Sequence, residues 1–522
     1  MAEKKTTGFW NKLRQQTQFG YKAIDDTTNR RHPVRNTTGE IAILNKAKRD
    51  KASATARDDR RSFTLLAWMI RRHLDNVSRF TPHIRTGDDN INMILRKAIR
   101  WHGRARQFDA LGKHGRDEWM RMFEACKVIG GDAAGLKTKG MKLQGIEGDR
   151  ISKPSAFTKI DGADQTRLDA VTGEGMTFNV DGTLKEYCIC KRGSTGKGLE
   201  FERLIPADEM IFDAYWPERF DSNRGVSPLL TALSEGADVR ETWEWLVLKA
   251  KASALFGLAF TRAGSDPMMP TQGDPETAPP ESESAAYSVQ VAAAIKARGM
   301  LSLDMDPGDE VKEIESKTPN NTVISFTREL IRSVLLSLDI PFTFYDSLTA
   351  SFSARIADRN EYEESCEWKR EKNISVLDKI YAEWLIPMWA KTNLFGLRDA
   401  LKTTKLSVEE IGASLLWVPA GRPWLDRSNE MSGHILALAA GVTSTPRICS
   451  SYGEDAYEIA KEQREYLDKA GIPLLYAQGG QVPVNDLLKQ ARDGQIPSDA
   501  PKKPDNTDEG DTDENTESNQ AS

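Results

Sequence analysis

The sequence predicts a predominantly helical α+β protein. Apolar residues recur every three or four positions over most of the chain, which is the period of an amphipathic helix. The stretch 141–220 instead carries short apolar segments bounded by Gly and Asp, the pattern of strands and hairpins. Of the 522 residues, 39% are hydrophobic and 29% are charged, so sizeable segments are expected to face solvent.

The N-terminal part is predicted to change from an arm to helices and then to strands. Residues 1–55 are polar, basic and rich in Thr and Asn, which is typical of a flexible arm. Three groups of apolar residues with helical spacing follow, and Gly130-Gly131 is a favourable helix end. Strands are predicted at 142–146, 176–180 and 186–190, with hairpin turns at Asp181-Gly182 and Gly193-Ser194.

A long helix is predicted in the middle of the chain. Ser227 suits a helix cap and Pro228 the first helical position, and an apolar stripe continues to about Phe260. A helix of about 30 residues is about 45 Å long, which is more than a small domain buries along its whole length. We therefore expect this helix to pack against a neighbouring domain or a neighbouring subunit.

Two further helices are predicted after an acidic loop. Residues 263–286 contain five Pro, five acidic residues and no basic residue, a composition typical of disorder. Strands at 300–304 and 310–314 are expected to flank a turn at 306–309. A helix at 320–338 is expected to stop before Pro341, because the residue before a proline leaves the helical region. Another helix runs from about Ser353 to Trp384, and the rest to 490 is mostly helical.

The net charge of −5 conceals a strong asymmetry. Residues 1–106 carry 24 Lys or Arg and 10 Asp or Glu, whereas residues 491–522 carry 3 basic and 9 acidic residues. The intervening residues 107–490 have a net charge of −13. Two interpretations remain open: partners of opposite charge, or ordinary solvated surfaces. The basic region 1–106 is suited to two kinds of partner: DNA phosphates, bound without sequence specificity, or an acidic protein surface.

Motifs for catalysis and for cofactor binding are missing from the sequence. Gly193-Ser-Thr-Gly-Lys-Gly198 departs from a phosphate loop, because Gly follows the lysine and Lys191 stands where the first Gly belongs. Cys188 and Cys190 are separated by one residue, and no second pair completes a zinc site. The six His form no His-Glu-x-x-His, and no Gly-x-Ser-x-Gly elbow occurs. The sequence therefore predicts no enzyme, no metal and no cofactor.

Features that would direct the chain to a membrane or an oxidising compartment are also missing. The polar N-terminus lacks the apolar region of a signal peptide, and no apolar run reaches 18 residues. The five cysteines are scattered and odd in number, which favours a reducing compartment.

An ordered series of segments resembles the portal proteins of tailed bacteriophages, specifically the lambda-like portal family. The resemblance runs from near Arg57 to about Trp389, roughly two thirds of the chain. Ser351-Phe-Ser-Ala-Arg355 stands where the family has Asn-Tyr-Ser-Ser-Arg, and Glu361 falls where the family has a Glu. The other segments that carry the resemblance are Met141–Arg150, Ile205–Ile211, Arg224–Leu230, Met305–Val311, Phe326–Pro341 and Ile386–Trp389.

The resemblance implies a portal protomer with an α/β wing, long stem helices, a clip, a tunnel loop and a helical crown, assembling into a ring. The implied segments are the arm 1–55, the wing 56–227, the first stem helix 228–262, the clip region 263–319, the second stem helix 320–340, the tunnel loop 341–353, a long helix 354–395 returning to the wing, a crown-like region 396–490 and a disordered acidic tail 491–522.

The resemblance also implies a function without catalysis or cofactors. Twelve copies would form a ring at one capsid vertex, with a channel for double-stranded DNA during packaging and ejection. The implied partners are further copies of the chain, the large subunit of the terminase, the major capsid and scaffolding proteins and the head-tail adaptors. The ring would also nucleate procapsid assembly, with assembly in the host cytoplasm and the final location in the virion.

Candidate residues fall into three groups. The candidates for contact with DNA in the stem are Lys249 and Lys251. The tunnel-loop candidates are Phe342, Thr343, Phe344, Ser347, Thr349, Ser351, Ser353 and Arg355, with core packing as the alternative for the two phenylalanines. The family-motif residues with a structural role are Arg224, Gly225, Pro228, Pro307, Gly308, Glu310, Pro341 and Glu361.

Two alternatives to a portal remain open at this point. One is a non-portal nucleic-acid-binding scaffold protein that uses the basic N-terminal region. The other is an enzyme with an unrecognised site.

Overall fold

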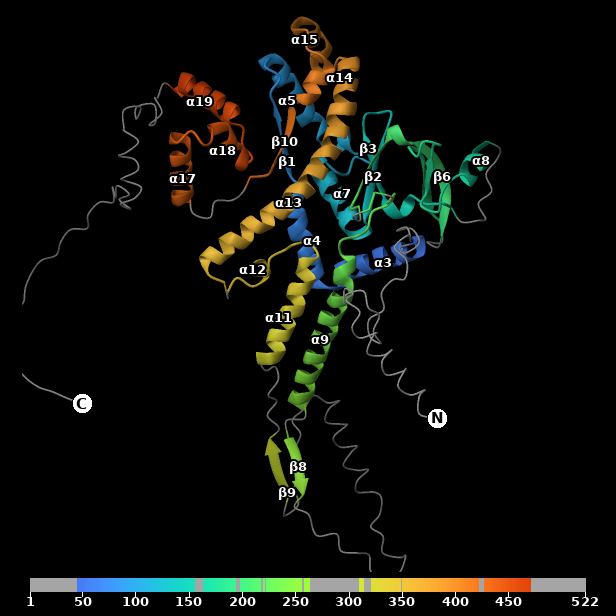
Figure 1. Cartoon of the computed structure of the whole chain (residues 1–522), viewed down its shortest axis with the longest axis vertical. Helices are drawn as coiled ribbons and strands as arrows, with labels where there is room; N and C mark the ends of the chain where they lie inside the picture. Colours follow the sequence, from blue (N-terminus) through green and yellow to red (C-terminus); the bar gives the residue numbers. More distant parts are fainter. Residues whose placement is uncertain are drawn as a thin grey trace, which may run out of the picture. The chain divides into compact units, whose positions relative to one another are not determined.

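The computed structural model describes residues 45–154, 163–193, 198–216, 219–220, 222–255, 258–262, 309–313, 321–348, 350–421 and 427–470. The chain divides into two compact units, Met1–Trp417 and Val418–Ser522 (Figure 1). Several predicted features lie outside the described residues: Pro307, Gly308, Thr349, the strand at 300–304, the acidic loop 263–286 and the acidic tail 491–522.

Helices open the first unit. They are α3 (Lys46–Ser62), α4 (Thr64–Val77), α5 (Asp89–His102), α6 (Ala105–Phe108) and α7 (Arg116–Gly130). The side chain of Asp88 caps α5 by accepting a hydrogen bond from the amide of Ile91. Gly131, with φ of 94°, ends α7, as predicted. The prediction of a flexible arm at 1–55 is wrong for residues 46–55, because helix α3 begins at Lys46 and packs on α4 and α7.

Two three-stranded antiparallel sheets follow the helices. In the first, β2 (Asp132–Lys137) lies between β3 (Leu143–Glu147) and β7 (Met210–Ala214). In the second, β5 (Leu184–Arg192) lies between β4 (Met176–Phe178) and β6 (Leu199–Pro206). The three predicted strands and the turn at Asp181-Gly182 are confirmed, and the Gly193 segment joins two paired strands.

Three long helices come next, and α9 (Leu230–Leu255) and α11 (Asn321–Leu336) lie side by side (Figure 1). The third, α13 (Phe352–Ile380), continues through a π-helical turn, Tyr381–Leu385, into α14 (Ile386–Thr392). The predicted first stem helix 228–262 was too long at both ends. Residues 258–262 are strand β8 (Leu258–Arg262), which pairs antiparallel with β9 (Asp309–Glu313).

The strands expected around the turn at 306–309 are described only in part. Strand β9, which contains Glu310, was predicted from its alternation and is confirmed. It pairs with β8, with Glu310 opposite Thr261, while the strand expected at 300–304 lies outside the described residues. Long-range pairing of this kind leaves no local sequence signal.

The buried core of the first unit consists of two large apolar clusters. One contains side chains of α5, α7, α13 and α14, with Tyr381 and Trp389 fully buried at its centre. The other joins α4 to the adjacent ends of α9, α11 and α13, and it includes Ile70, Leu229 and Val334. Together the clusters fix the ends of the long helices that face the sheets.

Short elements complete the structure. In the first unit these are β1 (Phe80–Ile84), α8 (Ala163–Asp169), α12 (Phe342–Tyr345), α15 (Leu397–Thr404) and α16 (Val408–Ala413). Strand β10 (Leu415–Pro419), which pairs with β1, spans the boundary between the two units. The second unit contains α17 (Arg427–Ala439), α18 (Thr445–Ser451) and α19 (Ala456–Ala470). None of the helices in the described ranges combines the length and the apolarity that a membrane crossing needs.

Candidate functional site

Arg224 ties the start of the long helix α9 to the first sheet. Its guanidinium is buried and makes a two-pronged ion pair with Asp132, at 2.6 Å from Nε and 2.9 Å from Nη2. Its other three N–H groups donate to the carbonyl oxygens of Ile151, Glu174 and Gly148, at 2.7, 2.8 and 2.6 Å. Burial opposes the charge, but Asp132 outweighs burial and holds the pKa of Arg224 above its ordinary value. All five donors of the side chain are therefore satisfied.

Gly225 follows in a place where no side chain fits. A Cβ atom on Gly225 would lie 2.0 Å from the carbonyl oxygen of Gly131, and a Cβ on Gly131 would lie 2.5 Å from that of Gly225. The two backbones touch where α7 ends and the segment toward α9 begins. The adjacent motif residues therefore hold the same segment in two ways. Arg224 hydrogen-bonds to the first sheet, and Gly225 lets the two backbones come into contact.

The start of α9 differs by two residues from the prediction. The hydroxyl of Ser227 donates to the carbonyl oxygen of Val128 at 2.6 Å and accepts from the amide of Leu229 at 3.2 Å. Pro228 lies in the turn before the helix, which begins at Leu230. Ser227 still satisfies a free amide at the helix start, so the capping prediction is confirmed in function although Pro228 is not the first helical residue.

At this same end of the helix pair, Asp339 closes α11. The amide of Asp339 donates to the carbonyl of Leu336, and that of Ile340 to the carbonyl of Leu335, which is the Schellman arrangement of a helix end. Asp339 has the left-handed φ of 60° that this arrangement needs. Lys369 of α13 pairs with its carboxylate at 2.7 Å. The predicted stop before Pro341 is confirmed, but the left-handed Asp339, and not the proline alone, turns the chain.

The first half of the predicted tunnel loop packs against the protein. Pro341 precedes α12, whose Phe342 and Phe344 lie partly buried against the apolar cluster of α4, α9 and α11. The ring of Phe344 contacts that of Tyr362 edge to face. Thr343 donates to Asp358 at 2.7 Å. The core-packing alternative for the two phenylalanines is the one that the structure shows.

The second half of the predicted loop lies at the surface. Leu348 is 95% exposed and Phe352 is 57% exposed. Ser351 caps α13 by accepting from the amide of Ala354 at 3.2 Å. The remaining described candidates of this region are exposed: Ser347, Ser353, Arg355 and, further along α13, Glu361.

The two candidate lysines of α9 do not lie on one face. Lys249 and Lys251 are both exposed near the end of the helix. Two residues along an α-helix correspond to a rotation of about 200°, so their side chains point to nearly opposite sides. A single channel wall can therefore receive one of them, but not both.

Exposed apolar side chains distinguish the far halves of α9 and α11. Trp245, Val247 and Leu248 on α9 are 62%, 51% and 55% exposed. Phe326 on α11 is 58% exposed, and Ile324 is 41% exposed. The predicted apolar stripe of α9 is buried at Leu229 and partly buried at Leu233 and Trp243, and it becomes exposed at Ala250. Within the described residues of one copy, these apolar side chains stay exposed.

A buried ionic network of α4, α7 and β7 has no counterpart in the sequence predictions. Glu124 of α7 contacts Lys127 at 2.8 Å and His73 of α4 at 3.0 Å, and it accepts a hydrogen bond from Tyr215. Lys127 also contacts Asp213 of β7 at 2.6 Å. On a helix, Glu followed three residues later by Lys reads as a solvated pair, so only the tertiary structure reveals its burial.

The network is ionised despite its burial. Burial disfavours the charge on Glu124, but Lys127 and His73 outweigh it and hold the pKa of that carboxyl well below its usual range. Burial lowers the pKa of His73, which is therefore neutral at pH 7. These contacts join α4, α7 and β7 in one arrangement, although Nδ1 of His73 has no hydrogen-bond partner among the described residues. Across the described part of the chain, no cluster of His, Cys, Asp or Glu is arranged to hold a metal ion.

Comparison with protein families gives a match to the phage portal proteins of the lambda family over residues 27–368. This match covers about two thirds of the sequence. The chain belongs to this family, which removes the alternative of a non-portal scaffold protein. No curated protein matches the sequence.

Comparison with solved structures gives matches to a gene transfer agent particle and to a phage portal protein. A chain from the neck of an empty gene transfer agent particle is 13% identical, with a TM-score of 0.43, over 77% of this chain and 93% of its own. A portal protein of the HK97 family from Corynebacterium diphtheriae is 14% identical, with a TM-score of 0.29, over 64% of this chain and 88% of its own.

Proposed function

We propose that twelve copies of this chain form a ring at one capsid vertex, and that the ring's channel carries double-stranded DNA during packaging and ejection. Membership of the portal family supports the general role. The observation that supports assembly into a ring is the exposed apolar surface on α9 and α11, which includes Trp245, Leu248 and Phe326. A closed ring covers such surface through contacts between different patches of neighbouring subunits.

The same proposal assigns partners and places. The ring docks the large subunit of the terminase, which supplies ATP hydrolysis, and later holds the head-tail adaptors. With the major capsid and scaffolding proteins it nucleates the procapsid in the host cytoplasm, and it remains at the portal vertex of the virion. Sequence supports this division of labour, since the chain has no phosphate loop.

DNA must slide through the channel and not be held. Duplex DNA carries about one charge per 1.7 Å, so many Lys or Arg contacts would retain it. Residues 107–490, with a net charge of −13, favour sliding. Residues 347–353 are the part of the loop that we assign to the channel, because residues 342–346 are held by Phe344 and by the Thr343–Asp358 hydrogen bond.

Negative-stain microscopy of the purified chain tests the ring. We expect rings of twelve or thirteen subunits with a central hole. A variant with Trp245→Ser and Phe326→Ser should assemble poorly, while Met93→Ser, an equally exposed apolar residue on α5, should assemble normally. A chain that stays monomeric at every salt and protein concentration would contradict the proposal.

The channel loop needs a separate test that spares the packed residues. Replacing residues 347–350 by two glycines leaves Phe344, Thr343 and the cap at Ser351 in place. Rings should form normally, whereas DNA packaging or retention should be impaired. Normal packaging by these rings would remove the loop from the channel.

A further inference from the structure

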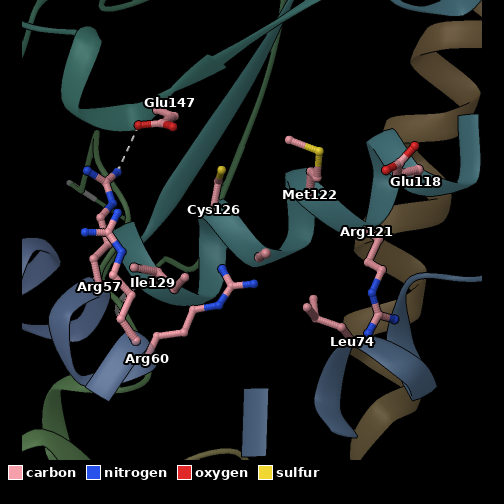
Figure 2. A pocket seen from close by; sticks show the side chains of 11 residues that line it. Arg57, Arg60, Leu74, Glu118, Arg121, Met122, Cys126, Ile129 and Glu147 are labelled. Atoms are coloured by element: carbon pink, nitrogen blue, oxygen red, sulfur yellow. Dashed lines mark hydrogen bonds and ion pairs between the residues drawn. The ribbon is translucent and has the colours of Figure 1, made fainter. Parts of the chain in front are cut away.

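A cavity of about 570 Å³ lies between α3 and α7 in the first unit. Figure 2 shows Arg57 and Arg60 extending from α3 on one side, with Met122 and Cys126 projecting from α7. Arg61 and Arg121 complete a set of four arginines around the cavity. All of the lining residues belong to a single protomer.

The four arginines differ in how their charge is balanced. Arg57 pairs with Glu147 at 3.2 Å and with Asp149 at 3.3 Å, and Arg121 pairs with Asp75 at 2.7 Å. Arg60 and Arg61 are exposed, and among the described residues no carboxylate lies within ion-pair distance of either. The cavity therefore has two uncompensated positive charges on the α3 side.

The remaining lining of the cavity is largely apolar. Leu74, Met122, Ala125 and Ile129 contribute apolar side chains, and Met122 is 46% exposed. The Cys126 thiol beside them is protonated, because burial raises its pKa to about 11. The site therefore combines an apolar floor with a cationic edge.

We propose that this cavity is a docking site for an acidic segment of a partner protein. An apolar side chain of the segment occupies the floor at Met122 and Ile129, and flanking carboxylates pair with Arg60 and Arg61. This is the combination that an acidic, partly apolar peptide offers, since hydrophobic contact supplies affinity and charge complementarity supplies selectivity.

Two other occupants fit less well. A DNA backbone has no apolar side chain for the floor, and its dense negative charge meets Glu118 and Glu147 in the cavity wall. In the acidic tail 491–522, the stretch 505–517 that holds most of the carboxylates contains no apolar side chain. A partner protein is therefore the occupant that the chemistry favours.

A binding assay with the full-length chain tests the proposal. The probe is a fluorescein-labelled peptide of twelve residues, Asp and Glu on both sides of a central Leu-Phe pair, and the readout is fluorescence anisotropy. Arg60→Glu with Arg61→Glu should weaken binding roughly tenfold or more, because two pairings become repulsions. Arg71→Glu with Arg100→Glu, an equal charge change at exposed positions outside the cavity, should leave binding unchanged.

Further arms of the assay separate the possible occupants. A peptide with Ser-Ser in place of Leu-Phe should bind more weakly, and Met122→Ala should reduce that difference. Absence of peptide binding, or equal loss in both arginine pairs, would overturn the proposal. Displacement of the peptide by a 20-base-pair duplex, sensitive to Arg60 and Arg61, would assign the site to DNA instead. Tighter peptide binding after deletion of residues 491–522 would assign it to the chain's own tail.

Discussion

Arg224 and Asp132 form a buried two-pronged ion pair that joins the base of α9 to the central strand of the first sheet. The two residues are 92 positions apart in sequence. The same guanidinium holds three backbone carbonyls, so one side chain fixes the direction in which the long helix leaves the sheet. Because α9 is 26 residues long, a small change of direction at its base displaces its far end by a larger distance.

We expect Arg224→Ala to destabilise the chain by about 3–5 kcal/mol, because Asp132 would be left buried without its partner. Arg224→Lys should also be costly, since a lysine cannot reproduce the two-pronged geometry. Urea unfolding of the purified chain measures both. Arg398→Ala, which removes an exposed arginine beside Asp399, is the control and should change stability by less than about 1 kcal/mol. Equal effects of the two alanine variants would contradict the assignment.

A methyl group at Gly225 should be strongly destabilising. Gly225→Ala would place a Cβ 2.0 Å from the carbonyl oxygen of Gly131, and backbone would have to move. Gly236→Ala on α9 is the matched control, because the nearest atom to its Cβ would be a Phe63 ring carbon at 3.8 Å. That control should be neutral or stabilising by up to about 1 kcal/mol, since alanine favours a helix interior. Thermal unfolding of both variants distinguishes these outcomes.

Acid should weaken the fold partly through His73. Burial lowers the pKa of His73 in the folded chain, so below about pH 6.5 the unfolded chain takes up a proton that the folded chain does not. Stability is therefore fully present above the unfolded pKa and falls as pH drops toward the folded pKa. Glu124, whose folded pKa is also lowered, adds a loss at still lower pH.

His73→Gln keeps a donor toward Glu124 but removes the titrating group. The fall in unfolding free energy between pH 7 and pH 5 should be smaller in this variant than in the unaltered chain. Urea unfolding at several pH values gives the comparison, and the other histidines cancel because both proteins contain them. Parallel pH profiles would show that His73 does not contribute.

The packed half of the 341–353 loop should come loose when its polar contacts are removed. Arg328 pairs with Asp346 at 3.2 Å, and Thr343 donates to Asp358. Asp346→Ala combined with Thr343→Val should increase chymotrypsin cleavage at Leu348 and Phe352 severalfold, because local opening exposes more backbone. Mass spectrometry of the fragments measures the rate. Ser347→Ala, which alters an exposed side chain, should leave the rate unchanged.

Single lysine variants of α9 should have unequal effects. Because Lys249 and Lys251 point to nearly opposite sides of the helix, we expect Lys249→Ala or Lys251→Ala, but not both, to alter DNA packaging or ejection by assembled rings. The unaffected variant then serves as the control for the other. Two unaffected variants would remove both residues from the channel.

Local patterns in the sequence determined most of the secondary structure. The period of apolar residues located the helices of the first unit and the long helices after it, and alternation located β3, β4, β5 and β9. Ordered motifs place the chain in the portal family, and the resemblance gives Arg224 and Gly225 a structural role without identifying their contacts. These signals are local because helix and strand periods repeat within a few residues.

Tertiary structure alone decided what those residues do. The pairing of β8 with β9 shortened the predicted stem helix, and Asp132 became the partner of Arg224. Glu124 and Lys127, which look like a solvated helix pair in the sequence, are buried in an ionic network. The predicted loop is divided after residue 346, because its first half packs against the protein and its second half is exposed. Such outcomes depend on which distant segments of the chain contact one another. The free energy of burying a charge or an aromatic ring is set by those contacts and not by the residues next to it in sequence.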